Sequence, residues 1–198
     1  MIRKKHHEEI CEQVLNAANL RFQQYGYNKT TMAEIAQDCD MSAANLYRHF
    51  KNKMDIVAQL ATQCLNEGSR KLLHIVNQKQ RSASMRLREF ALCQLQHHYD
   101  EFIQRPKLNE LVDIVCQQHQ YLVKEKMETE IEMLTRLITQ GIQQQEFSSD
   151  NITHDAEALH SALTIVSTPF FIPIFPIEEL ERKIEHLIQL ILRGLQKR

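Results

Sequence analysis

The stretch that decides the fold is TTMAEIAQDCDMSAANLYRHFKNK, residues 30–53. Thr31 and Glu34 have the spacing of a capping box, which predicts that a helix begins at Thr31. Asp40 lies at the following corner, where the chain needs a residue that tolerates a left-handed backbone. Ser42 can cap the next helix. Two short helices that meet at a tight corner are typical of a helix-turn-helix, which presents its second helix to the major groove of duplex DNA.

The outward side of that second helix contains almost nothing that needs burial, which argues against two short helices simply packed in a core. Ala43 and Ala44 are small enough to let the backbone approach base edges, and their methyl groups can contact thymine. Asn45 can bond a base edge or a phosphate, and Arg48 has the donor fork that suits guanine or phosphate. The residues predicted to contact DNA from this segment are Ser42, Ala43, Ala44, Asn45, Tyr47, Arg48, His49, Lys51 and Lys53.

The longer run AANLRFQQYGYNKTTMAEIAQDCDMSAANLYRHFKNK, residues 17–53, resembles the N-terminal domain of TetR-family transcriptional regulators. Its AA…F…GY…TT…EIA element, followed by S…LYRHFKNK, is more specific than a general helix-turn-helix pattern. The resemblance implies a phosphate contact for Thr31. It also implies that bases face Ala43, Ala44, Asn45 and Tyr47, and that phosphates are held by His49 and by Lys53 at the start of the next helix.

Two positions depart from the family's pattern. Arg21 stands where the family usually has an apolar residue, so it needs an exposed or paired site. Asp40 replaces the usual Gly of the corner, which we expect to make the corner stiffer.

Composition indicates a protein of long helices. The 198 residues include only four Gly and four Pro, too few for a turn-rich β architecture. The five cysteines are odd in number and widely spaced, as in a cytosolic protein with reduced thiols. The N-terminal MIRKKHHEEI lacks the apolar core of a signal peptide, and no apolar run approaches the ~20 residues of a membrane span. We therefore expect a cytoplasmic protein that does not enter a membrane.

Total charge does not predict a nucleic-acid partner. The whole chain has a formal net charge of -1, and residues 1–55 contain eight Lys or Arg against seven Asp or Glu. Only the placement of the basic side chains, near the end of the predicted recognition helix, favours DNA.

Helical spacing of apolar residues predicts an all-α chain in two parts. The first is a three-helix, helix-turn-helix DNA-binding domain, residues 1–52, and the second is a larger helical effector-binding and dimerisation domain, residues 53–198. The first helix should end before Gly26, which can serve as its cap. The helices expected after the corner span residues 53–79, 82–104, 107–116, a long helix to about 145, 153–166 and 177–196.

A small-molecule effector site in the middle helices is what the resemblance implies. The polar and apolar side chains there that could enclose a ligand are Phe90, Gln94, His97, Phe102, Cys116, Tyr121 and Phe170. Each of them, taken alone, also fits ordinary core packing.

The histidines and cysteines do not predict a metal site. Cys93 and His97 share a helix face, but the neighbouring His98 points about 100° away. His6-His7 lies close to the N-terminus and is isolated in the sequence. We expect neither a metal nor another cofactor.

The last two helices carry apolar stripes that can serve as a dimer interface. The final helix is apolar over more than one face, which suits contact with both its own domain and a partner. The resemblance implies that two such helices of each subunit form a four-helix interface. The predicted interface residues are Leu159, Leu163, Val166, Ile184, Leu187, Ile188, Ile191 and Leu195.

These patterns together predict a homodimeric transcriptional regulator that binds a palindromic, double-stranded operator and is released from it by a small molecule. The alternative is a protein of the same fold that serves as a coactivator or interaction scaffold without operator repression. An enzyme is not expected, because the chain lacks a Gly-rich phosphate loop, a nucleophile elbow and a metal-ligand repeat.

Overall fold

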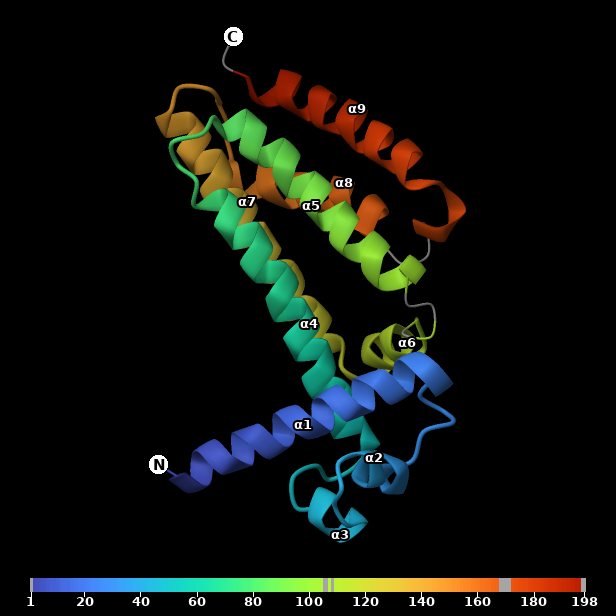
Figure 1. The fold of residues 1–198 in the computed structure, drawn as a ribbon. Coiled ribbons are helices and arrows are strands. Elements are labelled where there is room, and N and C mark those ends of the chain that lie inside the picture. The colour runs from blue at the N-terminus through green and yellow to red at the C-terminus, as the bar shows by residue number, and fades with distance from the viewer. Residues whose placement is uncertain (1, 105–106, 108, 168–171, 197–198) are drawn as a thin grey trace. The chain divides into compact units, whose positions relative to one another are not determined.

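The computed structural model describes residues 2–104, 107, 109–167 and 172–196, and in these residues it contains helices and no strand. The predicted all-α fold is confirmed. The helices are α1 Ile2–Tyr25, α2 Met32–Asp38, α3 Ala43–Leu46, α4 Lys53–Val76, α5 Ala83–Gln104, α6 Asn109–Gln118, α7 Gln120–Gln143, α8 Ile152–Ser167 and α9 Ile177–Leu195, with a 3₁₀ turn η2 at Ile172–Ile174 (Figure 1). None of these helices combines the length and the apolar character that a membrane crossing requires.

The helices group into two compact units, and each unit is assembled from two separate segments of the chain. Unit 1 comprises residues 1–64 and 105–123, and unit 2 comprises residues 65–104 and 124–198. The chain therefore passes from one unit to the other within α4, between α5 and α6, and within α7. The functional boundary at residue 52 stays a prediction, because compactness alone does not test what each part binds.

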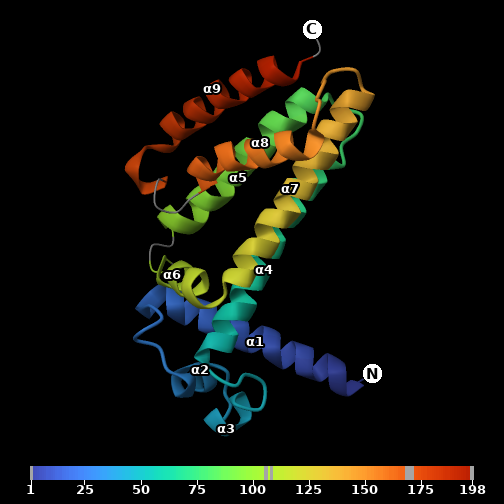
Figure 2. The same ribbon diagram turned by 180° about the vertical axis from the view of Figure 1, so that it is seen from behind.

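Unit 1 is built around the long helix α1, with α2 and α3 beside it (Figures 1 and 2). The apolar side of α1 is buried at Val14, Ala18 and Phe22. Gly26 follows with a φ of 86°, a left-handed conformation that ends the helix as predicted. The helix begins at Ile2 and contains no Gly or Pro.

Arg21, the unusual residue of α1, is paired as its chemistry requires. Its Nε and Nη2 atoms donate to the Asp38 carboxylate at 2.5 and 3.0 Å, and Nη1 lies 3.3 Å from a Glu34 oxygen. The hydrogen bonds from Arg21 lower the pKa of Asp38 below its usual range. Arg21 therefore joins α1 to α2 by a two-pronged ion pair at the surface.

Unit 2 consists mainly of α5, α7, α8 and α9, with α9 packed along α5 and α8 (Figure 2). The core side of α9 is one stripe, Leu180, Ile184 and Ile188, which is buried as the apolar spacing requires. Arg86 on α5 is also fully buried. Its guanidinium donates to the Val76 carbonyl at 2.9 Å and to Gln144 at 3.0 Å, and also to Gln140, so the charge closes the C-terminal end of α4.

The loop after α7 fixes two helix ends in unit 2. The Glu146 carboxylate accepts hydrogen bonds from the backbone N–H groups of Ala83 at 2.8 Å and Ser84 at 3.1 Å, which caps the start of α5. Phe147 is buried against Gly141 of α7, where a Cβ would lie 2.1 Å from the Phe147 ring. The absence of a side chain at Gly141 is what lets the loop fold back onto its own helix.

We predict that Gly141→Ala lowers the free energy of unfolding by about 1–3 kcal/mol, because the buried Phe147 ring has to shift. Gly194→Ala is the matched control, since a Cβ there has no neighbouring atom within 4 Å. It should raise the stability by about 0.5–1 kcal/mol through helix propensity. Thermal or urea unfolding measures both, and equal effects of the two substitutions would contradict the packing described for Gly141.

Candidate nucleic-acid interface

The corner between α2 and α3 is built by the local signals predicted from the sequence. Thr31 is the N-cap of α2, and its side chain and that of Glu34 form the complete capping box. Asp40 has a φ of 53°, so the corner is left-handed as predicted. Ser42 is the N-cap of α3, where its hydroxyl accepts from the Asn45 N–H at 3.2 Å. This hydroxyl satisfies a backbone group of its own helix.

Helix α3 covers only the first part of the segment predicted to contact DNA, because it ends at Leu46. After Leu46 the backbone tightens, with hydrogen bonds from Arg48 N to Asn45 O and from His49 N to Leu46 O, as at many helix ends. Leu46 and Phe50 are both buried, which holds this turn against the unit's core. The outward surface consequently consists of one helical turn followed by a 3₁₀-like turn.

The exposed side chains of this surface are Ala44, Tyr47, Arg48 and Lys51, while Ala43, Asn45 and His49 are half-buried. Tyr47 is the most notable, because 53% of a large aromatic side chain is exposed. No hydrogen bond or ion pair of the described residues occupies the guanidinium of Arg48. Small, aromatic and basic side chains thus lie together directly after a helix-turn-helix corner, which is the chemistry that base edges and phosphates accept.

Thr31 is exposed, but its polar atoms are already used. Its hydroxyl donates to Glu34 Oε2 at 2.8 Å, and its backbone N–H donates to the same oxygen at 2.8 Å. These bonds lower the pKa of Glu34 and keep an ionised carboxylate beside Thr31. A phosphate contact by Thr31, which stays a prediction, would compete with this carboxylate.

Lys53 has an internal role that the sequence did not reveal. Its Nζ donates to the carbonyls of Tyr27 and Thr30, each at 2.6 Å, and lies 3.9 Å from the centre of the Tyr27 ring. Burial lowers the pKa of Lys53, with Glu34 and Glu110 acting in the opposite direction. An ammonium has three donors, so one remains for the predicted phosphate contact.

The N-terminal end of α4 is also partly satisfied from within. Asn52 Oδ1 accepts from the Asp55 N–H at 2.9 Å, and the Asp55 carboxylate accepts from the Lys51 N–H at 3.0 Å. The carboxylate lies where the helix dipole favours negative charge. The side chain of Lys51, in contrast, points to solvent and is available to a phosphate.

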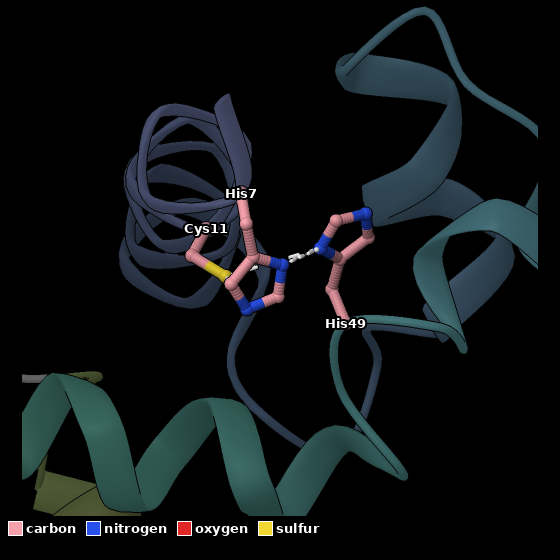
Figure 3. A group of neighbouring side chains, drawn as sticks. All are labelled: His7, Cys11 and His49. Atoms are coloured by element: carbon pink, nitrogen blue, oxygen red, sulfur yellow. Dashed lines mark hydrogen bonds between the residues drawn. The ribbon is translucent and has the colours of Figure 1, made fainter. Parts of the chain in front are cut away.

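A cluster of His7, Cys11 and His49 lies beside this surface, and the sequence analysis missed it (Figure 3). His7 and Cys11 project from α1 toward His49 in the turn after α3. The two Nδ1 atoms of His7 and His49 are 2.9 Å apart, and Cys11 Sγ lies 3.6 Å from His7 Nε2. The spacing of His7 and Cys11, four residues apart on one helix, was the signal available in the sequence.

The predicted effector residues are divided between the two units. Phe90, Gln94 and Phe102 are buried in unit 2, where His97 is half-buried. Cys116 and Tyr121 belong to unit 1 and are exposed. Phe170 lies outside the described residues. The assignment of these residues to an effector stays a prediction.

The structure instead brings a buried polar group together in unit 2, next to Gln94. The Glu130 carboxylate lies 2.6 Å from Lys126 Nζ and 3.1 Å from His160 Nε2, and Gln94 also bonds to it. Burial raises the pKa of Glu130, but the bonds from His160 and Lys126 outweigh it and hold the pKa at about 2. Burial and the nearby Lys126 lower the pKa of His98 to about 3, so this imidazole is neutral at pH 7.

The side-chain carbonyl oxygen of Gln94 is an acceptor in this polar group that receives no hydrogen bond from the described residues. Within the described part of the chain, its Oε1 is buried and has no hydrogen-bond partner. An unsatisfied buried carbonyl costs free energy unless a water or a ligand donates to it. The sequence pointed to Gln94 but not to its partners, because Gln94 lies on α5, Lys126 and Glu130 lie on α7, and His160 lies on α8.

Most of the predicted dimer residues are buried within their own subunit, namely Leu159, Leu163, Ile184, Ile188 and Leu195. Leu187 and Ile191 are half-buried, and the side chain of Val166 lies outside the described residues. The outer side of α9 presents Leu190, which is 66% exposed. The dimer interface stays a prediction, and the apolar side chains of α9 that are at least partly exposed include Leu187, Leu190 and Ile191.

Two family models match the chain. The model "Bacterial regulatory proteins, tetR family" matches residues 14–60, and the model "Tetracyclin repressor-like, C-terminal domain" matches residues 83–188, more than half of the chain. The chain belongs to the TetR family. TetR-family proteins are DNA-binding transcriptional regulators and not enzymes, so the exposed surface after the corner is that of the family's DNA-binding domain. No curated protein sequence matches the chain.

Solved TetR-like structures resemble the chain over nearly its whole length. A transcriptional regulator from Cytophaga hutchinsonii is 25% identical, with a TM-score of 0.75 over 94% of this chain and 98% of that chain. A putative TetR-family regulator from Mesorhizobium loti is 17% identical, with a TM-score of 0.78 over 96% and 98%. SmeT, the repressor of a Stenotrophomonas maltophilia multidrug efflux pump, is 17% identical, with a TM-score of 0.67 over 94% and 90%.

We predict that Lys53→Ala mainly lowers the stability of the fold, whereas Lys51→Ala mainly lowers the affinity for DNA. Lys53→Ala should lower the free energy of unfolding by about 2 kcal/mol, because two carbonyls lose a charged donor. Lys51→Ala should leave stability within about 0.5 kcal/mol. It should weaken binding to any DNA and reduce the salt slope by about one per lost phosphate contact. Thermal unfolding and salt titrations of DNA binding measure the two effects, and unchanged stability in Lys53→Ala would refute its internal role.

Proposed function

We propose that this TetR-family protein is a cytoplasmic repressor that binds a palindromic operator as a homodimer and leaves it when a small molecule binds unit 2. The observation that carries the DNA-binding part is the exposed group of Ala44, Tyr47, Arg48 and Lys51, which directly follows a correctly capped helix-turn-helix corner. The remaining parts are argued from the buried polar group and from the outer side of α9.

At the operator, Ala44 and Asn45 face the bases and the flanking side chains hold phosphates. Ala44 is exposed and small, so the helix can enter a major groove closely enough for Asn45 to reach a base edge. Arg48 supplies a bidentate hydrogen-bond donor, and Tyr47 and Lys51 contact phosphates of the DNA backbone on either side. The phosphate contacts supply most of the affinity, and Ala44 and Asn45 supply the sequence preference.

A single recognition surface of this size is too small for tight binding, so the protein acts as a two-fold symmetric pair. Symmetric dimers bind half-sites separated by about one helical turn of DNA. On α9, Leu187, Leu190 and Ile191 offer the apolar contact, and a large exposed leucine is better buried than hydrated. On α8, the exposed Ala158 and Ser161 are small enough for a partner helix to approach closely.

The effector binds the polar group of unit 2. The unused Gln94 Oε1 suits a hydrogen-bond donor of the ligand, and the buried Phe90 and Phe102 belong to the same helix. Support for a small molecule also comes from the similar fold of SmeT, which has been solved in a complex with triclosan. The ligand we infer is therefore an apolar or aromatic molecule with one donor group.

Coupling between effector and DNA runs through segments that belong to both units. Helices α4 and α7 begin in unit 1 and continue in unit 2. A displacement of their unit 2 ends on effector binding is therefore transmitted along each helix to its residues in unit 1. In unit 1, the α6 residue Glu110 accepts from the Tyr27 N–H at 3.0 Å, in the loop that Lys53 also binds. A 100-fold loss of operator affinity requires only about 2.7 kcal/mol of coupling.

The experiment that tests DNA binding compares wild type with Arg48→Ala by fluorescence anisotropy over a range of salt concentrations. Wild type should bind duplex DNA with a steep salt dependence, and Arg48→Ala should bind at least tenfold more weakly, because a bidentate contact is worth about 1–3 kcal/mol. Arg70→Ala, an exposed arginine of unit 2, is the matched control. An equal loss of DNA affinity in the two variants, or a wild-type protein that does not bind DNA, would favour the alternative of an interaction scaffold.

We predict that Leu190→Glu yields folded monomers, because it places a charge on an exposed apolar contact without disturbing the subunit's core. Gln189→Glu, at the neighbouring exposed position, should remain dimeric. Size-exclusion chromatography with light scattering measures the assembly, and circular dichroism confirms the fold. A dimer of unchanged stability in Leu190→Glu would place the interface elsewhere.

A further inference from the structure

Three side chains with metal-ligating atoms meet at the edge of the DNA-binding surface: His7 and Cys11 from α1 and His49 from the turn after α3 (Figure 3). Their ligand atoms, one from each residue, lie within 4.8 Å of one another. In the described part of the chain this is the one group of three or more such residues with that spacing. His7 and His49 are separated by 42 positions, so the tertiary fold alone creates the cluster.

The distances are close to those of a tetrahedral metal site, although His7 meets Cys11 through Nε2 and His49 through Nδ1. Cys11 Sγ lies 3.6 Å from His7 Nε2 and 4.0 Å from His49 Nδ1, and the nearest nitrogens of the two histidines are 2.9 Å apart. At the usual Zn–N and Zn–S bond lengths, tetrahedral ligand atoms are about 3.3–3.6 Å apart. Rotation about the side-chain torsions of the two histidines can bring one atom of each residue from within 4.8 Å to this spacing.

A simple hydrogen bond explains only part of this arrangement. Two stacked neutral imidazoles can share one proton between their Nδ1 atoms, and the rings here are 4.8 Å apart and nearly parallel. That bond does not involve the thiol of Cys11, which faces both rings and makes only weak sulfur–nitrogen contacts with them. It also leaves the second nitrogen of His7 directed at the sulfur rather than at solvent.

The ligand chemistry selects the class of ion. Two imidazoles and one thiol, with no carboxylate among them, suit a borderline-soft d-block cation and not magnesium or calcium. Cysteine ligates a metal ion as the thiolate, so binding at Cys11 would release the thiol proton. His7 is exposed, which leaves a fourth position open to water.

We propose that His7, Cys11 and His49 bind Zn²⁺ and that this ion ties α1 to the turn carrying Tyr47 and Arg48. An ion with two positive charges on one thiolate adds one net positive charge beside the residues that face phosphate. It also fixes the turn before DNA arrives, which reduces the ordering that binding requires. The zinc-bound protein therefore binds DNA more tightly, a consequence that rests on the proposed function, whereas the site itself does not.

The test of the site is a titration of the full-length, reduced protein with Co²⁺, followed by displacement with Zn²⁺. Wild type should bind one equivalent of Co²⁺, with a thiolate-to-metal charge-transfer band and the intense visible bands of four-coordinate cobalt. Cys11→Ser should lose the charge-transfer band, and His7→Ala and His49→Ala should lose the visible bands. Zn²⁺ should raise the melting temperature of wild type and leave that of His7→Ala unchanged. Since His7 is exposed, its removal leaves the fold intact.

Two variants serve as matched controls. His6→Ala removes the adjacent, exposed histidine that is not part of the cluster. Cys93→Ser removes the thiol of a second Cys–His pair, Cys93 and His97, which has the same four-residue spacing on α5. Both variants should bind Co²⁺ as wild type does. A spectrum unaffected by Cys11→Ser, or lost in Cys93→Ser, would overturn the proposed site.

DNA binding separates this inference from the proposed function. Zn²⁺ should tighten binding of wild type several-fold in anisotropy titrations at fixed salt and should have no effect on His7→Ala. Tight zinc binding with unchanged or weaker DNA affinity would overturn the link to the recognition turn. A protein that binds zinc but no DNA would refute the proposed function and leave the metal site standing.

Discussion

The recognition surface depends on one ammonium group. Lys53 Nζ binds the carbonyls of Tyr27 and Thr30, each at 2.6 Å, and covers the Tyr27 ring. These contacts join the first residue of α4 to the loop between α1 and α2, which in turn sets where α2 begins. Because α3 follows α2 through a corner of only four residues, an error in the loop would move the whole recognition turn. The helix that leads to unit 2 is thereby anchored in the domain that meets DNA.

The local features of this unit were predictable because each rests on residues close together in the chain. The capping box of Thr31 and Glu34, the left-handed corner at Asp40 and the cap at Ser42 all follow from spacings of a few residues. The helix bounds followed equally well, since Gly, Pro and apolar periodicity act locally. The end of α3 did not follow from such spacings, because the tightening after Leu46 depends on how Phe50 is held in the core.

The site chemistry was harder to predict because it depends on distant pairs. Lys53 reaches carbonyls more than 20 positions away, and Glu130 meets His160 across 30 positions. The cluster around His49 joins positions 42 apart, so His7 looked isolated in the sequence. The apolar stripe of α9 was evident from its spacing, yet only the fold shows that Ile184 and Ile188 are covered while Leu190 is exposed. Periodicity predicts that a face is apolar, not what covers it.

We propose that the turn from Ala43 to Lys51 reads DNA as part of a symmetric pair of subunits. Selection of bound sequences from a pool of randomised duplexes tests it most directly. We expect an inverted repeat whose half-sites are separated by about one helical turn. We also expect the preferred base at one position of each half-site to change in Asn45→Ala while the spacing stays the same. No enriched sequence, or one without two-fold symmetry that Asn45→Ala leaves unchanged, would contradict the claim.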